Sequence, residues 1–301
     1  MSTFIEKAYL GKTSAWRYLL LPLAFIGFMT YNYLATIGSG EDTNALMKTM
    51  IESLGATTVL VMLLMPLVVG FFVLLIYGLR VLKMPLKALF TARDSFDWNR
   101  VFFAFFLWAI VVSGTTLIDV AFAPDNYEIQ FDWDSFWPFA LVAIALIPLQ
   151  TSFEELLFRG HMTQGLGIIS GRRAVAFLVP SVIFGVMHIG NPEVAELGYE
   201  ILIYYIGSGL FFGAMTLMDE GTELALGFHA SNNLVGALLV SSDWTAFQVP
   251  SVLKDVGPAS FGIDALIPVV VIYPLVLWLL SKKYKWNAIG LKLFGRVYYV
   301  A

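Results

Sequence analysis

Eight stretches of this chain are long, apolar and almost free of charge, and they constrain its fold more than any other feature. Each holds about 20 residues, the number that a helix needs to cross a bilayer. They do not alternate as β-barrel strands do, so the sequence predicts an all-α membrane protein with eight transmembrane helices. The predicted spans are Tyr18–Ile37, Ser53–Leu79, Val101–Ala123, Ser135–Phe153, Ala174–Gly190, Ile201–Met218, Leu224–Ser242 and Ala265–Ser281.

Composition supports lipid as the solvent of this chain. Charged residues make up 13% of it, whereas a soluble domain carries roughly 25%. The net charge of −4 offers no basic stripe for nucleic acid, and the absence of cysteine excludes disulfides and thiolate chemistry. No linker or repeat divides the sequence, so we expect residues 1–301 to form a single transmembrane domain.

The basic residues test the number of spans independently. If the N-terminus is cytoplasmic, only Lys48 and Lys254 of the 18 Lys and Arg residues lie outside the predicted inner segments. This asymmetry is the one that the positive-inside rule predicts. We therefore expect both termini to be cytoplasmic. The inner segment 80–100 fits either a basic amphipathic surface helix or a solvated loop.

Ionisable side chains inside the predicted spans are costly and usually mark a cavity or a pathway. The pair Glu154–Glu155 lies in a helical pattern that continues to the first stop signal, Ser170-Gly171. Glu154 is 17 residues before Gly171 and His188 is 17 residues after it. Both therefore lie about 25 Å from the turn, level with each other on an antiparallel hairpin.

A second histidine, His229, is predicted to lie at a similar depth in the membrane, on a helix that begins at another turn. His229 lies eight residues beyond Gly221, which corresponds to about 12 Å of helix. Asn233 follows at i+4 and shares a face with His229. Small residues in the sixth span, including Gly209 and Gly213, favour close helix packing.

Three motifs carry a resemblance to a known family. They are Glu154-Glu155-x-x-x-Arg159, Phe184-x-x-x-His188 and His229-x-x-x-Asn233. In this order they resemble the motifs of the CAAX-protease and bacteriocin-processing family of intramembrane glutamic endopeptidases, which is related to the type II CAAX prenyl endopeptidases. The resemblance covers residues 135–245, which we interpret as a catalytic core of four helices. Residues 1–134 are interpreted as N-terminal accessory spans.

The resemblance implies a mechanism. Glu154 and His188 would activate a water molecule, while His229 and Asn233 would hold the developing oxyanion. Glu155 and Arg159 would support these groups, or form a structural i,i+4 ion pair. A desolvated carboxylate suits a general base, and imidazole and amide N–H groups suit an oxyanion site. The expected substrate is a peptide or protein, which can be membrane-associated or lipidated, and the expected location is a bacterial cytoplasmic membrane with the active site in its cytoplasmic half.

Three alternatives stay open at this point. Two histidines and a glutamate are also a common zinc set, although the His-Glu-x-x-His signature is absent. We expect no cofactor, and zinc is the alternative. A proton-coupled transporter would also use intramembrane Glu and His, but no inverted repeat is visible. A scaffold or bacteriocin-immunity protein of the same fold would keep the helices without needing the complete set of catalytic groups.

Overall fold

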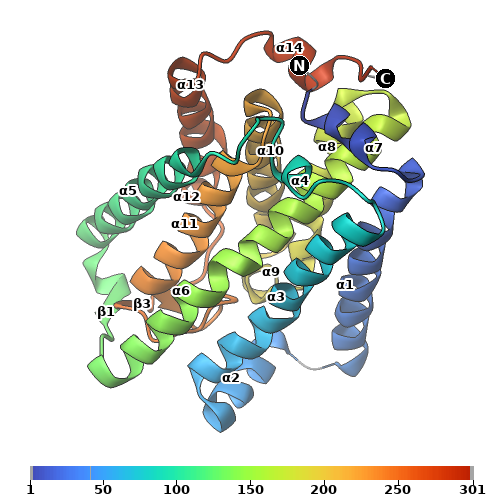
Figure 1. Ribbon diagram of the computed structural model, residues 1–301. Coiled ribbons are helices and arrows are strands. Elements are labelled where there is room, and N and C mark those ends of the chain that lie inside the picture. Colours follow the sequence, from blue (N-terminus) through green and yellow to red (C-terminus); the bar gives the residue numbers. More distant parts are fainter. Residues whose placement is uncertain (1–2, 41, 299–301) are drawn as a thin grey trace.

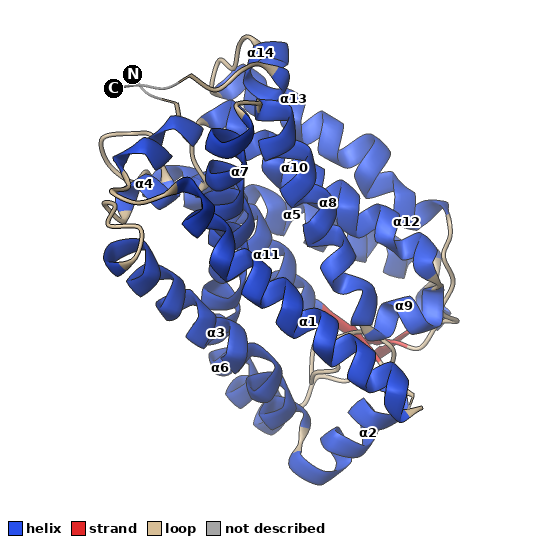
Figure 2. Cartoon of the chain, turned by 90° about the vertical axis from the view of Figure 1, so that its right-hand side faces the viewer, coloured by secondary structure: helices blue, strands red, loops and turns tan. Residues whose placement is uncertain are grey.

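The computed structural model describes residues 3–40 and 42–298, and the remaining residues of the predicted single domain lie outside this description. Long helices form a bundle, and a small sheet lies at one of its ends (Figures 1 and 2). The first half contains η1 (Ile5–Leu10), η2 (Ala15–Leu19), α1 (Leu20–Ser39), α2 (Thr43–Leu54), α3 (Ala56–Arg80), α4 (Lys87–Phe90), α5 (Trp98–Phe122), η3 (Pro124–Asn126) and β1 (Tyr127–Ile129). The next segment contains α6 (Trp133–Glu155), η4 (Leu156–Met162), α7 (Thr163–Ser170), α8 (Arg173–Val186), η5 (Met187–Gly190), α9 (Pro192–Leu197) and η6 (Tyr199–Ile201). The last segment contains α10 (Leu202–Asp219), α11 (Glu223–Leu239), β2 (Val240–Ser242), β3 (Leu253–Asp255), α12 (Ile263–Ile267), η7 (Pro268–Ile272), α13 (Tyr273–Lys283) and α14 (Ile289–Phe294).

The all-α membrane fold predicted from the sequence is confirmed. Among the described residues, seven helical segments are long and apolar enough to cross a membrane. They correspond to all the predicted spans except Leu224–Ser242. That prediction is too long, because α11 has only 17 residues and the chain continues into strand β2.

Helix α11 nevertheless runs along the bundle from one end to the other. The turn before α11 contacts the N-terminal and C-terminal segments, since Glu220 accepts a hydrogen bond from the Phe4 backbone and pairs with Lys292. Strand β2 follows α11 at the opposite end, in a sheet of order β1-β3-β2. The pairing of β2 with β3 is parallel, and that of β1 with β3 is antiparallel. The two terminal segments therefore meet at one end of the bundle.

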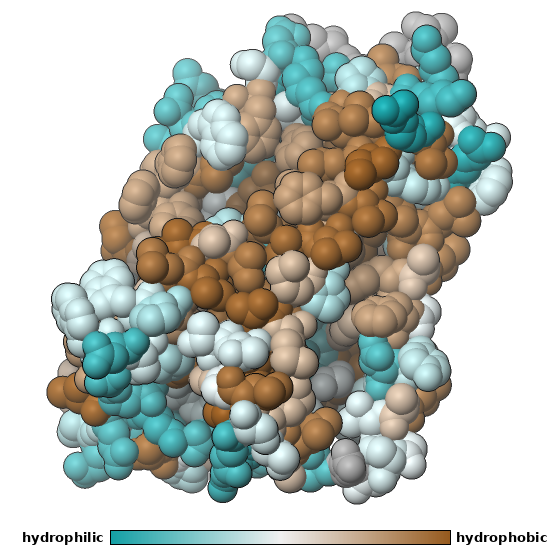
Figure 3. Space-filling model, turned by 60° about the horizontal axis from the view of Figure 1, so that its bottom comes forward, coloured by the Kyte–Doolittle hydropathy of each residue, from teal (hydrophilic) through white to brown (hydrophobic). Residues whose placement is uncertain are grey.

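An apolar belt crosses the face of the molecule shown in Figure 3. Figure 3 shows hydrophobic residues across the middle of the visible face, with hydrophilic residues on both sides of them. Large exposed side chains such as Phe28, Ile76 and Phe106 come from α1, α3 and α5. Exposing such side chains to water is unfavourable, whereas lipid tails solvate them at no cost. The protein is a multi-pass membrane protein.

The helices differ in how deeply they are buried. In the most apolar part of the span Ala15–Ser39 only 6% of the residues are buried, whereas the corresponding share in Tyr199–Asp219 is 67%. Helix α10 is thus a central helix, and α1 lies at the periphery. Central helices exclude lipid, so a polar site is expected around α10 and its neighbours.

The predicted hairpin is present. The segment α6–η4–α7 runs as one continuous helical rod from Trp133 to Ser170 and ends at Gly171, whose φ of 65° is left-handed. A left-handed position at the end of a helix favours glycine, because glycine has no Cβ. Helix α8 then returns beside the rod. The turn η4 is π-helical, a feature that the sequence did not indicate and that often occurs at functional sites.

Glycines allow α8 and α10 to touch, as the sequence predicted. A Cβ on Gly209 would lie 2.2 Å from the carbonyl oxygen of Ser181, and a Cβ on Gly213 would lie 2.7 Å from its hydroxyl oxygen. No side chain fits at 2.2 Å from a backbone atom, so close approach of the two helices requires glycine here.

We expect Gly209→Ala to lower stability by about 2 kcal/mol, because the methyl group forces α8 away from α10. Gly236→Ala is the matched control: it lies in α11, and a Cβ there meets nothing within 4 Å. Thermal unfolding in detergent measures both variants. Equal melting temperatures for the two would contradict close packing at Gly209.

Ion pairs hold the start of α11. Arg93 contacts Asp219 at 2.6 Å and Glu223 at 2.9 Å, and Arg100 contacts Asp219 at 2.7 Å. Both arginines belong to the segment 80–100, which is mostly a loop with one short helix, α4, and not an amphipathic surface helix; Arg100 lies in the first turn of α5. The loop and the start of α5 therefore fix the end of α11 from which His229 is positioned.

Candidate active site

Two adjacent carboxylates lie where α6 passes into the π-helical turn η4. Glu155 is completely buried and the side chain of Glu154 is 13% exposed. Adjacent residues of a helix project about 100° apart, so the two carboxylates leave the helix in different directions. Both nevertheless reach the same imidazole on α11.

His229 lies between these carboxylates. Its Nδ1 is 2.7 Å from Glu155 Oε1, and its Nε2 is 3.5 Å from Glu154 Oε2. An ionised carboxylate only accepts hydrogen bonds, so Nδ1 carries the hydrogen toward Glu155. The ring also stacks on Phe212 of α10, with centroids 5.0 Å apart. Its position is thus fixed on two sides.

Arg159 completes the buried charge cluster. Its Nη1 is 3.2 Å from Glu155 Oε1, and its Nη2 donates to the carbonyl of Gly209 at 3.1 Å. The guanidinium also lies over the ring of Phe184, 4.2 Å from its centroid. Only 1% of this side chain is exposed. Glu155 therefore connects a buried cation to the imidazole of His229.

His188 also packs against Phe184. It lies in the 3₁₀ turn η5, just after the end of α8. Its Nδ1 is 2.8 Å from the carbonyl oxygen of Phe184, and its ring stacks on Tyr205 at 4.3 Å. Phe184 touches both histidine rings, at 5.0 Å from His188 and 5.8 Å from His229. Among the described contacts, none joins His188 directly to Glu154.

A chain of amides extends the cluster. Gln150 donates to Glu154 Oε1 at 2.9 Å and accepts from Asn233 Nδ2 at 3.5 Å. Asn232 in turn donates to Asn233 at 3.1 Å and accepts from Trp108 Nε1 at 3.1 Å. This network links α5, α6 and α11 around the glutamate.

A small cavity opens beside these groups. Its volume is about 60 Å³, room for about two waters, since one water occupies about 30 Å³ in the liquid. Its walls include His188, His229 and Asn233, together with the aromatic rings of Trp108, Tyr205 and Tyr273. Trp108 and Tyr273 come from outside residues 135–245.

Several of these side chains were not singled out from the sequence. Gln150, one helical turn before Glu154, could have been identified as a candidate because it is a polar residue inside an apolar run. Tyr205, Phe212 and Trp108 could not have been identified in this way, because aromatic residues are common in any membrane helix. Asp119, a carboxylate near the end of α5, accepts a hydrogen bond from Tyr127 outside the cluster. Within residues 3–40 and 42–298, no group of three or more His, Asp or Glu side chains is arranged to hold a metal ion.

The fold and the cluster together define a polytopic membrane protein with a polar site enclosed by its central helices. Residues 133–235 match the model of a family described as type II CAAX prenyl endopeptidase, Rce1-like. The three motifs all lie in this matched segment, so the resemblance to CAAX proteases is confirmed as a similarity.

One similar protein is the uncharacterized protein YyaK of Bacillus subtilis. It is 31% identical over 162 residues, which are 54% of each protein. The chain therefore spans about half the length of this curated relative. No solved structure gives a significant match.

Proposed function

We propose that this protein is an intramembrane endopeptidase in which Glu154, His188, His229 and Asn233 hydrolyse a peptide bond by direct attack of water. The observation that carries the proposal is the convergence of Glu154 and His229, 3.5 Å apart, with His229 in the wall of a cavity that has room for water. Catalytic partners must lie within reach of each other directly or through one water, and these two do.

Glu154 is the proposed general base. It is the less buried of the two carboxylates, and its Oε1 is oriented by Gln150. His188 assists it as a proton relay. Because Nδ1 of His188 faces the carbonyl of Phe184, this nitrogen carries the hydrogen, and Nε2 of the neutral ring is free to accept a proton.

His229 and Asn233 are the proposed oxyanion donors. Because the Nδ1 hydrogen of His229 is directed to Glu155, the ring donates to the oxyanion through Nε2, which carries a hydrogen only in the imidazolium form. Both donor residues line the cavity, and they lie one helical turn apart on α11. A donor fixed before the reaction stabilises the tetrahedral intermediate without reorganising. Glu155 and Arg159 fix His229 through the hydrogen bond to Nδ1, so we assign them as positioning residues.

The proposed mechanism needs no metal cofactor. The residues around Glu154 supply a base, a relay and two donors, which is the set that water attack requires. Cleavage by protein treated with a strong chelator is therefore expected at the untreated rate. Loss of cleavage on chelation, and its return with Zn²⁺, would favour the zinc alternative.

The proposed substrate is a peptide or protein that reaches the site from the membrane, including a lipidated one. The proposed location is a bacterial cytoplasmic membrane, with the active site in its cytoplasmic half. The cytoplasmic placement follows from the positive-inside distribution of Lys and Arg, which puts the start of α11 and the two terminal segments on the cytoplasmic side.

We expect a strain that carries His188→Ala in place of the wild type to accumulate one uncleaved precursor in its membranes. Loss of the relay should slow cleavage about 100-fold. Quantitative membrane proteomics identifies the precursor, and immunoblotting checks that the variant is as abundant as the wild type.

His161→Ala is the matched control, because this buried histidine contacts Tyr18 and Tyr77 rather than the cavity. It should leave the precursor processed. Unchanged membrane proteomes in both strains, at normal abundance, would contradict the peptidase and support a scaffold of the same fold.

A further inference from the structure

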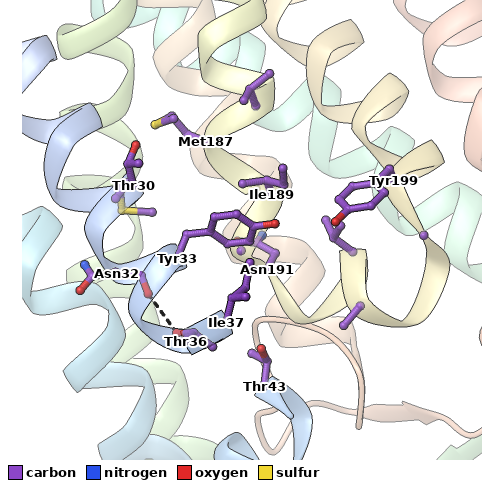
Figure 4. A pocket seen from close by; sticks show the side chains of 16 residues that line it. Thr30, Asn32, Tyr33, Thr36, Ile37, Thr43, Met187, Ile189, Asn191 and Tyr199 are labelled. Carbon is purple, nitrogen blue, oxygen red and sulfur yellow. Dashed lines mark hydrogen bonds between the residues drawn. The ribbon is translucent and has the colours of Figure 1, made fainter. Parts of the chain in front are cut away.

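A second, much larger cavity lies outside the cluster of catalytic groups. Its volume is about 600 Å³, within the roughly 300–1,000 Å³ range of small-molecule sites. One wall is the second half of α1 and the other is formed by η5 and α9 (Figure 4). The peripheral helix α1 contacts the rest of the bundle mainly through η2, η4 and η5. The cavity is thus the space between a peripheral helix and the body of the protein.

The lining of this cavity is amphipathic but uncharged. Apolar walls come from residues such as Met29, Met187 and Ile189, and hydroxyl groups come from Thr30, Tyr33 and Tyr199. Figure 4 shows Tyr33 and Thr30 projecting from α1 toward η5. None of the described residues that line the cavity is charged. A ligand with a net charge would lose its hydration here without gaining a partner.

The position of the cavity matches the boundary between lipid tails and headgroups. The spans Ala15–Ser39 and Arg173–Gly190 both end beside it. Tyr33 and Tyr199 lie near these ends, and tyrosine is enriched at such boundaries. Acidic residues flank the lining in the chain: Asp42, Glu196 and Glu200. Anionic headgroups would be repelled there, so the charge pattern selects against acidic lipids.

We propose that this cavity binds the hydrocarbon chain of a neutral glycerolipid, with its uncharged hydroxylated headgroup at the end lined by Thr43 and Tyr199. A polypeptide fits less well. Its backbone N–H and C=O groups would need partners along the whole cavity, which the apolar walls at Met29, Met187 and Ile189 do not offer, and each unsatisfied group is costly. The neighbouring backbone of η5 is already folded into a turn, closed by the hydrogen bond from Asn191 to His188. A hydrocarbon chain has no such requirement.

A bound lipid would contact the residues on both sides of His188. Met187 and Ile189 line this cavity, whereas His188 lines the small cavity beside His229. The turn η5 therefore separates the two cavities. Lipid binding here can be measured without any enzymatic assay, so its test does not depend on the proposed peptidase.

The test uses the full-length protein in phosphatidylcholine vesicles with a monoacylglycerol that carries a photoreactive group on its acyl chain. We expect saturable labelling of peptides from the second half of α1 and from 186–199. Unlabelled monoacylglycerol should displace the probe, and phosphatidylglycerol or an apolar peptide should not.

Thr30→Trp fills the cavity and should reduce labelling about tenfold, a loss of affinity of about 1.4 kcal/mol. Ala35→Trp is the matched control, because Ala35 is exposed on α1 and does not line the cavity. If Thr30→Trp fails to fold, Ala195→Trp fills the cavity from the opposite wall. Unsaturable labelling, displacement by phosphatidylglycerol or by the peptide, or equal labelling of the filled and control variants would each overturn the proposal.

Discussion

Glu154→Gln is expected to lower the rate of peptide cleavage about 10³-fold while the protein stays folded. Glutamine keeps the volume of the side chain, and its carbonyl oxygen can still accept the hydrogen bond from Gln150. It cannot accept a proton from water, so only the chemical step is lost. The rate is measured with purified protein in vesicles and the precursor identified by membrane proteomics.

Glu128→Gln is the matched control for this prediction. Glu128 is exposed on β1, away from the cluster, and its replacement should change neither the cleavage rate nor the melting temperature. Cleavage by Glu154→Gln at the wild-type rate would remove Glu154 from the proposed mechanism. A fall in its melting temperature comparable to that expected for Gly209→Ala would indicate a structural role instead.

The sequence predicted the frame of the site because that frame depends on local rules. Hydrophobic length gives the spans, and Gly171 marks the turn of the hairpin, where the structure has a left-handed residue. These rules fix the depth of Glu154 and His188 in the bundle. The structure accordingly places the side chains of all three motifs around one small region, with Phe184 in contact with both histidines.

The pairing of the carboxylates could not be predicted in the same way. Glu155, not Glu154, makes the shorter contact with His229, at 2.7 Å against 3.5 Å. Which of the two carboxylates lies closer to His229 depends on the rotation of α6 about its axis and on the packing of α11 against α6. Sequence spacing gives the 100° between adjacent residues but not the absolute rotation, which the packing of neighbouring helices determines.

The contacts around His188 also could not be predicted from the sequence. Its ring stacks on Tyr205 from α10, and its Nδ1 faces a backbone carbonyl. The predicted span extended through His188 as one helix, whereas α8 ends at Val186 and His188 lies in a 3₁₀ turn. Such a turn depends on the contacts of the segment that follows, which have no periodic signature in the sequence.

Arg159→Met is expected to have the largest effect on stability, a loss of about 3–5 kcal/mol. The substitution leaves the carboxylate of Glu155 completely buried, with His229 as its remaining ionisable partner. It also removes the hydrogen bond to the Gly209 carbonyl and the contact with the ring of Phe184. Thermal unfolding in detergent measures the loss. Arg80→Met, an exposed change at the end of α3, should shift stability by less than about 0.5 kcal/mol.

A double variant separates the structural role of the pair from its role in positioning His229. Glu155→Gln with Arg159→Met removes both charges, and such neutral replacements of a buried ion pair often restore stability. The imidazole of His229 then lacks the carboxylate that fixes its Nδ1 hydrogen, so cleavage should stay about 10²-fold below the wild-type rate even where the melting temperature recovers. Recovery of both stability and cleavage would mean that the pair serves the fold alone. A wild-type melting temperature in Arg159→Met would instead show that the buried guanidinium is not needed to balance the charge of Glu155.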